Sequence, residues 1–145
     1  MDFRYTPEQE AFRSRLREWL ERNKAEVFGH DSDPTADRDE DSDTRWRKTR
    51  QWHRRLYEAG YVALHWPKEW GGGGASLVEQ AIYQDEVLRL GLPLYGANQL
   101  ALDRIGPTLM FLGTDEQRQR FLPPMHTAEE SWCQGYSEPG ASSEL

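Results

Sequence analysis

Cysteine is nearly absent from this chain, and long apolar runs are absent altogether. Cys133 is the only cysteine among 145 residues, so no internal disulfide can form and a reducing compartment is expected. No apolar run approaches the length needed to cross a membrane, and residues 1–8 lack the apolar centre of a signal peptide. These absences predict a soluble cytoplasmic protein.

An excess of positive charge is also lacking. The formal net charge is −7 at pH 7, which argues against general nucleic-acid binding. Residues 45–55 are the exception, since they hold six positive charges and no acid, interleaved with Trp46 and Trp52. A basic helix with tryptophans could bind a nucleic acid, a membrane surface or an acidic protein, and the overall acidity weighs against the first two.

Complete motifs for phosphate or metal binding are missing as well. Residues 71–74 are four glycines, but the Lys-Ser/Thr pair that closes a phosphate-binding loop does not follow them. Residues 31–43 hold seven acids without the spacing or central glycine of a calcium-binding EF-hand, and predict a flexible or solvated loop. His53 and His65 lack a second ligand at metal-binding spacing, so both are interpreted as structural residues and no metal site is predicted.

What the sequence does contain is a series of helix signals. Thr6 and Gln9 predict a capping box with Pro7 in the first turn, and Gly29 predicts the end of that helix. Its apolar positions recur at helical spacing and predict core packing: Phe12, Leu16, Trp19, Leu20 and Val27.

Two more helices follow. The first is expected from near Thr44 to Gly60, and the second opens with a capping box of Ser76 and Glu79 and runs to Gly91. One face of the second is predicted to carry Val78, Ala81, Ile82, Asp85 and Leu88.

Helix signals continue to about residue 125. Residues 95–112 repeat apolar positions at threes and fours, with Asn98 and Leu112 on the same face, and should kink or divide at the glycine-proline pair 106–107. Thr114 with Gln117 opens a last short helix, which is expected to end at the double proline 123–124. The chain up to this point therefore predicts five or six short helices, no strand and an all-α fold.

The last fourteen residues, 132–145, have a different character. A short aromatic stretch leads into the turn-forming Ser-Glu-Pro-Gly at 137–140 and then into small hydroxyl residues. This pattern predicts a strand running into a tight turn. Backbone N–H groups and the hydroxyls of Ser137, Ser142 and Ser143 would be free there to meet an anionic or polar ligand.

Four segments also carry a resemblance to a known family. They are residues 3–10, 66–72 (W-P-K-E-W-G-G), 113–124 (G-T-D-E-Q-R-Q-R-F-L-P-P) and 132–145. In this order they resemble four segments of the acyl-CoA dehydrogenases: the helical opening, the proline-glycine turn, the G-T-E-E-Q-K-x-x-[FY]-L-P segment and the strand ending in [ST]-E-P-x-A-G-S-D. Because they cover essentially the whole chain in the right order, the resemblance is specific.

The resemblance implies a helical N-terminal domain over residues 1–127 and the first strand of a β-barrel middle domain over residues 128–145. Members of the family add a C-terminal four-helix bundle, bind FAD between the middle and C-terminal domains, and assemble into homo- or hetero-oligomers. They remove a proton from the α carbon of an acyl-CoA thioester, transfer hydride from the β carbon to the flavin, and pass electrons to an electron-transferring flavoprotein. Their carboxylate base lies in the C-terminal domain, so no catalytic residue is predicted in this chain.

Site residues follow from the same resemblance. The residues matching FAD contacts are Gln134, Tyr136, Ser137, Ser142 and Ser143, the last also lying near the CoA portion of the substrate. The residues matching the wall of the acyl pocket are Gly96, Ala97 and Leu100, with Ala101 and Arg104 on the same helix. The small residues would leave room for a bulky or branched acyl group. A less favoured alternative is that the serines are plain turn residues, and the helix could equally be packed core.

Three functions are therefore considered. The leading hypothesis is an N-terminal fragment of an FAD-dependent acyl-CoA dehydrogenase of fatty-acid or lipid degradation, inactive and unable to bind FAD firmly as the isolated chain. The second is a truncated, non-catalytic helical module that binds full-length relatives or another protein, and it requires exposed apolar surface. The third is a small helical interaction domain that uses residues 45–55 to bind an acidic partner in a salt-dependent way.

Overall fold

The computed structural model describes residues 4–29 and 41–135, and all regular structure in these two ranges is helical. The all-α prediction is thereby confirmed for the described part of the chain. The α-helices are α1 (Pro7–Val27), α2 (Ser42–Glu58), α3 (Leu77–Arg89), α4 (Gly106–Leu112) and α5 (Asp115–Thr127). Three short elements connect them: η1 (Lys68–Trp70), η2 (Gly96–Asn98) and the π-helical turn η3 (Ala101–Ile105).

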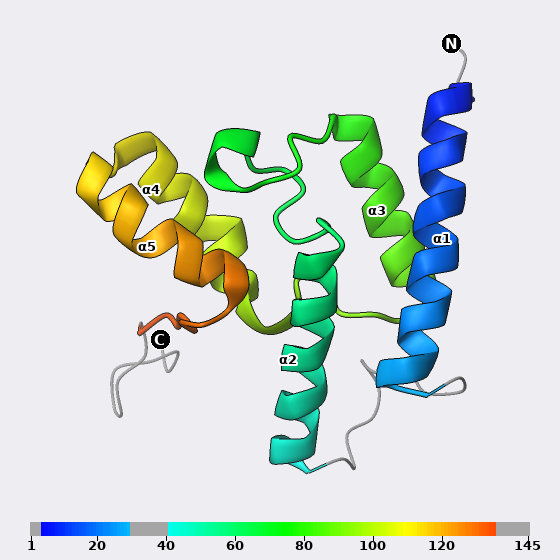
Figure 1. Ribbon diagram of the computed structural model, residues 1–145, viewed down its shortest axis with the longest axis horizontal. Coiled ribbons are helices and arrows are strands. Elements are labelled where there is room, and N and C mark those ends of the chain that lie inside the picture. Colours follow the sequence, from blue (N-terminus) through cyan, green and yellow to red (C-terminus); the bar gives the residue numbers. More distant parts are fainter. Residues whose placement is uncertain (1–3, 30–40, 136–145) are drawn as a thin grey trace, which may run out of the picture.

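The helices form two pairs with α2 between them. Helix α1 packs along α3 on one side of the molecule, and α4 packs on α5 on the other (Figure 1). Helix α2 begins at the bottom of this view and runs up into the middle of the molecule, and the last described residues lie beneath α5 (Figure 1). No helix within the described ranges combines the length and the apolar character needed to span a membrane.

Helix α1 begins and ends where the sequence predicts. The Gln9 amide N–H donates to the Thr6 hydroxyl at 3.3 Å, and the Thr6 amide N–H donates to the Gln9 side chain at 2.9 Å. These reciprocal bonds satisfy two amides that the first turn leaves without helical partners. After Val27 the chain reaches Gly29, whose φ of +93° lies in the left-handed region that glycine adopts without strain. Of the predicted apolar positions, three are buried: Leu16, Leu20 and Val27.

Helix α2 starts two residues earlier than predicted. The Asp41 carboxylate accepts a hydrogen bond from the Thr44 amide at 2.9 Å, so Asp41 is the N-cap and Ser42 is the first helical residue. The acidic loop predicted over residues 31–43 is therefore wrong at its last two positions, which are helical. Positions 31–40 lie outside the described residues.

Helix α3 has the predicted start but a different buried face. Ser76 and Glu79 form the capping box. Of the residues predicted to share one face (Val78, Ala81, Ile82, Asp85 and Leu88), only Ile82 is buried. The side chains that α3 buries are instead Ile82, Tyr83, Glu86 and Val87. The physical reason is that the carboxylate of Glu86 is neutralised by arginines of α1, so a charged residue occupies a position where periodicity favours an apolar one.

Residues 95–112 form three consecutive elements instead of one kinked helix: η2, η3 and α4. Gly106 begins α4 with Pro107 in its first turn, so the predicted division at this pair is confirmed. The Trp66 indole N–H donates to the Leu102 carbonyl at 2.8 Å, and a Cβ on Gly106 would overlap that indole ring. The apolar repeat does not stay buried to its end, since Asn98 is 2% exposed and Leu112 is 83% exposed.

Helix α5 opens with the predicted capping box of Thr114 and Gln117 but does not end at the double proline. It continues through Pro123 and Pro124 to Thr127. The carbonyl of Pro124 accepts from the Glu130 amide at 3.2 Å, and Leu122 and Met125 on either side of the prolines are buried in the core. Core packing of these two side chains outweighs the loss of two amide donors.

The strand predicted after residue 131 is absent from residues 131–135, the part of it that the structure describes. There the chain is tied to helical elements instead. The Trp132 amide donates to the side chain of Asn98 at 3.3 Å, and the Trp132 ring meets Phe121 edge-on with centroids 5.4 Å apart. Residues 136–145 lie outside the described residues.

Candidate functional site

A buried amide joins the two segments that the sequence assigns to ligand binding. Asn98, in the predicted acyl-pocket segment, is 2% exposed. Its side-chain N–H groups donate to the carbonyls of Met125 at 2.8 Å and Glu130 at 2.9 Å, and its carbonyl accepts from the Trp132 amide. All the polar atoms of this side chain are therefore satisfied by backbone. The result is that residues 96–98 fix the position from which the chain leaves the helical domain toward the predicted flavin segment.

The sequence interpretation missed this role of Asn98. A signal was present, because Asn98 occupies an apolar-spaced position in residues 95–112, and a buried amide must find hydrogen-bond partners. The partners lie 27 to 34 residues further along the chain. Only the folded structure shows which backbone groups they are.

Helix α2 supports the same segment from behind. The His53 ring is buried, and its two nitrogens lie 3.2 Å from the Tyr95 carbonyl oxygen and 2.9 Å from that of His126. Gly96 has a φ of +57°, and a Cβ there would approach the Cβ of His53 to 2.7 Å. A glycine at this position thus allows both the left-handed turn and the close approach of α2. These contacts agree with the interpretation of His53 as a structural residue.

His126 extends this polar network into the core. Its ring is half-buried against Trp66, with centroids 5.9 Å apart, and its Nε2 lies 3.3 Å from the Val62 carbonyl oxygen. Burial lowers the pKa of His126, and the neighbouring His53 acts in the same direction, although the bond to Val62 opposes them. A neutral His126 ring suits this position between an indole face and a backbone carbonyl.

The predicted acyl-pocket residues lie together but differ in exposure. Gly96, Ala97 and Leu100 are partly exposed on η2 and the turn that follows it. Ala101 is buried in the core, and Arg104 is exposed.

The predicted FAD contacts are described at only one position. Gln134 is exposed at the end of the described chain, whereas Tyr136, Ser137, Ser142 and Ser143 lie outside the described residues. One exposed amide cannot hold a flavin, so the described residues do not fit this cofactor by themselves and no chemical step is derived through it. Within the same residues, no group of three or more His, Cys, Asp or Glu side chains is arranged to hold a metal ion.

Glu86, the carboxylate with the most strongly lowered pKa among the described residues, has a structural role. Glu86 is 1% exposed and is bonded by Arg17 at 2.6 Å, Arg13 at 2.7 Å and Arg89 at 3.0 Å. These hydrogen bonds, led by that of Arg17, lower the pKa of Glu86 to about 2 although burial acts in the opposite direction. The cluster fastens α1 to α3. Glu86 is not suited to act as a catalytic base, since an ionised carboxylate with three guanidinium partners is a poor proton acceptor.

Some side chains of the basic segment 45–55 make structural contacts within the chain. Trp52 is buried, and its indole N–H donates to the Pro93 carbonyl at 3.0 Å. Arg55 bonds Asn23 at 2.7 Å and Glu26 at 2.6 Å, and so connects α2 to α1. These contacts account for part of the charge and aromatic content that suggested an interaction helix.

Comparison with known proteins agrees with this arrangement. A family model described as "Acyl-CoA dehydrogenase, N-terminal domain" matches residues 6–129. The acyl-CoA dehydrogenase IpdE1 of Mycobacterium tuberculosis is 38% identical over 145 residues, covering 94% of this chain and 34% of that protein.

Two solved structures show the same fold. One is the ChsE4-ChsE5 complex from Mycobacterium tuberculosis, with a TM-score of 0.70 and 33% identity over 97% of this chain and 33% of the matched chain. The other is the Tcur3481-Tcur3483 steroid ACAD, with a TM-score of 0.69 and 31% identity over 97% of this chain and 34% of the matched chain. The chain thus spans about a third of the length of these relatives. It belongs to the acyl-CoA dehydrogenase family, whose N-terminal helical domain it forms.

Proposed function

We propose that this chain is the N-terminal helical part of a flavin-dependent acyl-CoA dehydrogenase. Such an enzyme introduces a double bond between the α and β carbons of an acyl-CoA thioester, and its electrons pass to FAD and on to an electron-transferring flavoprotein. The observation that carries the proposal is the match of residues 6–129 to the family's N-terminal domain. The isolated 145 residues are expected to be inactive, because the family's base belongs to a part that this chain does not match.

In this proposal the helical domain positions two segments. Residues 96–100 form one wall of the acyl pocket, and Gln134, Tyr136, Ser137, Ser142 and Ser143 approach the FAD, with Ser143 also near the CoA. The Asn98 side chain supports this arrangement, since it bonds both Met125 beneath the pocket wall and Trp132 at the start of the flavin segment. Glycine and alanine at positions 96 and 97 favour a bulky acyl group. The description of one structural relative as a steroid ACAD suggests a ring-bearing acyl chain.

The intact mass of the native gene product, isolated from its own cells, tests this proposal. A flavin-containing species two to three times heavier than the 16.9 kDa of this chain is the expected result. Acyl-CoA-dependent bleaching of its flavin absorbance would then identify the substrate class. A flavin-free species of 16.9 kDa would overturn the catalytic proposal and leave the second candidate function.

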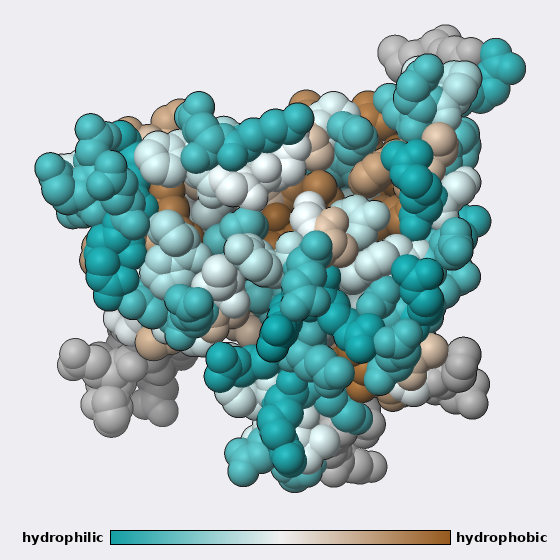
Figure 2. Space-filling view, in the orientation of Figure 1, coloured by the Kyte–Doolittle hydropathy of each residue, from teal (hydrophilic) through white to brown (hydrophobic). Residues whose placement is uncertain are grey.

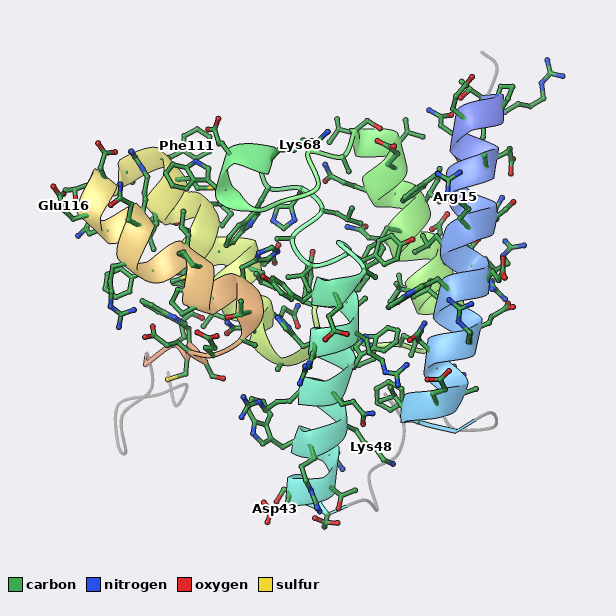
Figure 3. The ribbon with its side chains drawn as sticks, in the orientation of Figure 1. Arg15, Asp43, Lys48, Lys68, Phe111 and Glu116 are labelled. Carbon is green, nitrogen blue, oxygen red and sulfur yellow. The ribbon has the colours of Figure 1, made fainter. Side chains whose placement is uncertain are left out.

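That second candidate is a helical module that binds full-length relatives. Its support is exposed apolar surface: Leu77, Phe111 and Leu112 are 82%, 85% and 83% exposed. Figure 3 labels Phe111 on the outer side of α4. Two of the matched structures are named as assemblies of two proteins, so association between members of this family is known. Co-purification of a tagged 145-residue chain with a flavin-bearing relative from its own cells would support this function.

A further inference from the structure

Helix α2 carries a basic and aromatic surface that lies away from its buried side. Its members recur three or four residues apart along the helix and are all exposed: Trp46, Arg47, Arg50, Arg54 and Tyr57. We call this surface the α2 face. The first turns of α2 project below the other helices in Figure 1, and Figure 2 shows mostly hydrophilic residues over them.

The three arginines of the α2 face have N–H donors that the fold leaves unused. Arg50 makes no hydrogen bond or ion pair with any described residue. Among the described residues, Arg54 donates only through its Nε, to Glu58 at 2.9 Å. Arg47 donates to groups in the first turn of its own helix at 3.3 and 3.0 Å. Since a guanidinium has five N–H donors, most of those on this surface remain available to a ligand.

The spacing of these arginines is unfavourable for the helix itself. Arg50 follows Arg47 by three residues and precedes Arg54 by four, and like charges at these spacings repel each other. The helix has no acidic residue between Asp43 in its first turn and Glu58 at its end. An anion bound to Arg50 would relieve this repulsion.

A hollow adjoins the α2 face where it approaches the end of α5. Its volume is about 550 Å³, and it lies between α2 and residues 127–129. Arg50, Arg54 and Tyr57 are among the residues that line it. The Tyr57 ring is held edge-on against His126, with centroids 5.0 Å apart, and its exposed part offers an apolar contact beside the two charges. The hollow can therefore receive both a carboxylate and an apolar side chain.

The α2 face is short and is bounded by acids. Trp46 and Tyr57 are separated by about 16 Å along the helix axis, which is roughly three turns. Asp43 lies at the projecting end of α2 (Figure 3), and Glu58 and Glu129 line the hollow near the other end. A nucleic acid or an anionic membrane extends beyond this length and would meet those carboxylates. A short segment with a few acidic side chains would not.

We propose that the α2 face binds an acidic segment of a partner protein, about three helical turns long. Carboxylates of this segment accept charge-assisted hydrogen bonds from Arg50 and Arg54, and an apolar side chain packs against Tyr57 in the hollow. Charge complementarity selects this occupant, because the chain as a whole is acidic and this surface is basic. Neither the predicted acyl wall nor the flavin segment takes part, so this binding is independent of the proposed catalytic function.

The test is titration of the isotope-labelled 145-residue chain at low salt with an acetylated and amidated peptide of four Glu-Glu-Leu repeats. Saturable amide NMR shifts are expected in residues 46–57 and 127–129, and the affinity should fall as salt is added. The matching peptide of Gln-Gln-Leu repeats should produce no saturable shift.

Substitutions separate the charged contribution from the aromatic one. Arg50→Gln should weaken binding of the Glu peptide about threefold, and Arg50→Gln with Arg54→Gln about tenfold, as expected for exposed charge pairs. Trp46→Ser should also weaken binding but leave its salt dependence unchanged. Arg22→Gln is the matched control, because Arg22 is exposed on α1 and does not line the hollow.

Three results would overturn the proposal: no saturable shift with the Glu peptide, equal binding of the Gln peptide, or unchanged affinity in the double arginine variant. Two further titrations distinguish other anionic partners. Tighter binding of a twelve-nucleotide oligouridylate would assign the α2 face to RNA, and tighter binding of phosphatidylglycerol vesicles would assign it to a membrane. Either outcome would contradict an acidic protein segment as the occupant.

Discussion

The Glu86 carboxylate is buried and nevertheless charged, because three guanidinium groups surround it. Two of them, on Arg13 and Arg17, come from α1, and the third, on Arg89, comes from α3. A buried ion of this kind is tolerated only when its partners remain in place. The side chain therefore acts as a charge-dependent connection between the first and third helices.

This connection predicts a pH dependence of stability. The pKa of Glu86 falls from an ordinary 4.5 to about 2 in the folded chain, so its contribution is full above pH 4.5 and is lost as the pH falls toward 2. Glu86→Gln should lower the free energy of unfolding by about 3 kcal/mol at neutral pH, and it should flatten the stability profile between pH 4.5 and 2. Urea denaturation across this range measures both effects.

Glu18→Gln is the control for that experiment, because Glu18 is exposed on the same helix as two of the arginines. Its stability profile should follow that of the unmodified chain. An unchanged acid dependence in Glu86→Gln would show that other carboxylates determine the profile.

Asn98 gives a second prediction at the residue scale. Asn98→Ala leaves the carbonyls of Met125 and Glu130 without their donors and the Trp132 amide without its acceptor. We expect the free energy of unfolding to fall by about 2 kcal/mol and the Trp132 amide to exchange with solvent faster. Hydrogen exchange monitored by NMR measures this, with the exposed neighbour Gln99→Ala as control. Equal protection of the Trp132 amide from exchange in both variants would contradict a stabilising role of its hydrogen bond to Asn98.

At the scale of elements, local signals were predictable and long-range ones were not. The capping boxes at Thr6, Ser76 and Thr114 are confirmed because each depends on residues within three positions. The buried face of α3 did not follow from its periodicity, because the partners that allow Glu86 to be buried are on α1, about 70 residues away. Helix α5 passes its double proline because Leu122 and Met125 pack into the core, which the proline rule does not consider.

The start of α4 yields a prediction about packing between elements. A Cβ on Gly106 would overlap the buried Trp66 indole, whose N–H is fixed by its bond to Leu102. Gly106→Ala should therefore destabilise the chain by about 1–3 kcal/mol, despite the better helix propensity of alanine. Gly135→Ala is the control, since nothing lies within 4 Å of a Cβ there. Urea denaturation followed by tryptophan fluorescence compares the two, and a neutral or stabilising Gly106→Ala would contradict the packing argument.

At the scale of the whole molecule, the sequence predicted the class of fold and the family but little of the site. Gly96, Ala97 and Leu100 do share one segment, and that segment contacts the start of the predicted flavin segment through Asn98. The sequence could not show this contact, because it depends on how α2 and α5 meet around η2. The roles of the pocket and flavin residues stay predictions.

The exposed apolar residues predict association of the whole chain. Phe111 and Leu112 stand next to one another at the end of α4, and together they favour self-association or binding to another protein. The double substitution Phe111→Ser with Leu112→Ser should lower the average mass measured by light scattering at high concentration and leave the unfolding free energy nearly unchanged. Leu88→Ser, at another exposed leucine on α3, is the control. The idea fails if all three proteins are monomeric at every concentration.

The buried amide of Asn98 also sets an order of events during protein synthesis. Its partners follow it by 27, 32 and 34 residues, so a ribosome delivers them only after α4 and most of α5 have been made. Until then the amide remains hydrated and the helices cannot close around it. We therefore expect the domain to complete its folding only once residue 132 has emerged, when the segment expected to meet the flavin begins to appear.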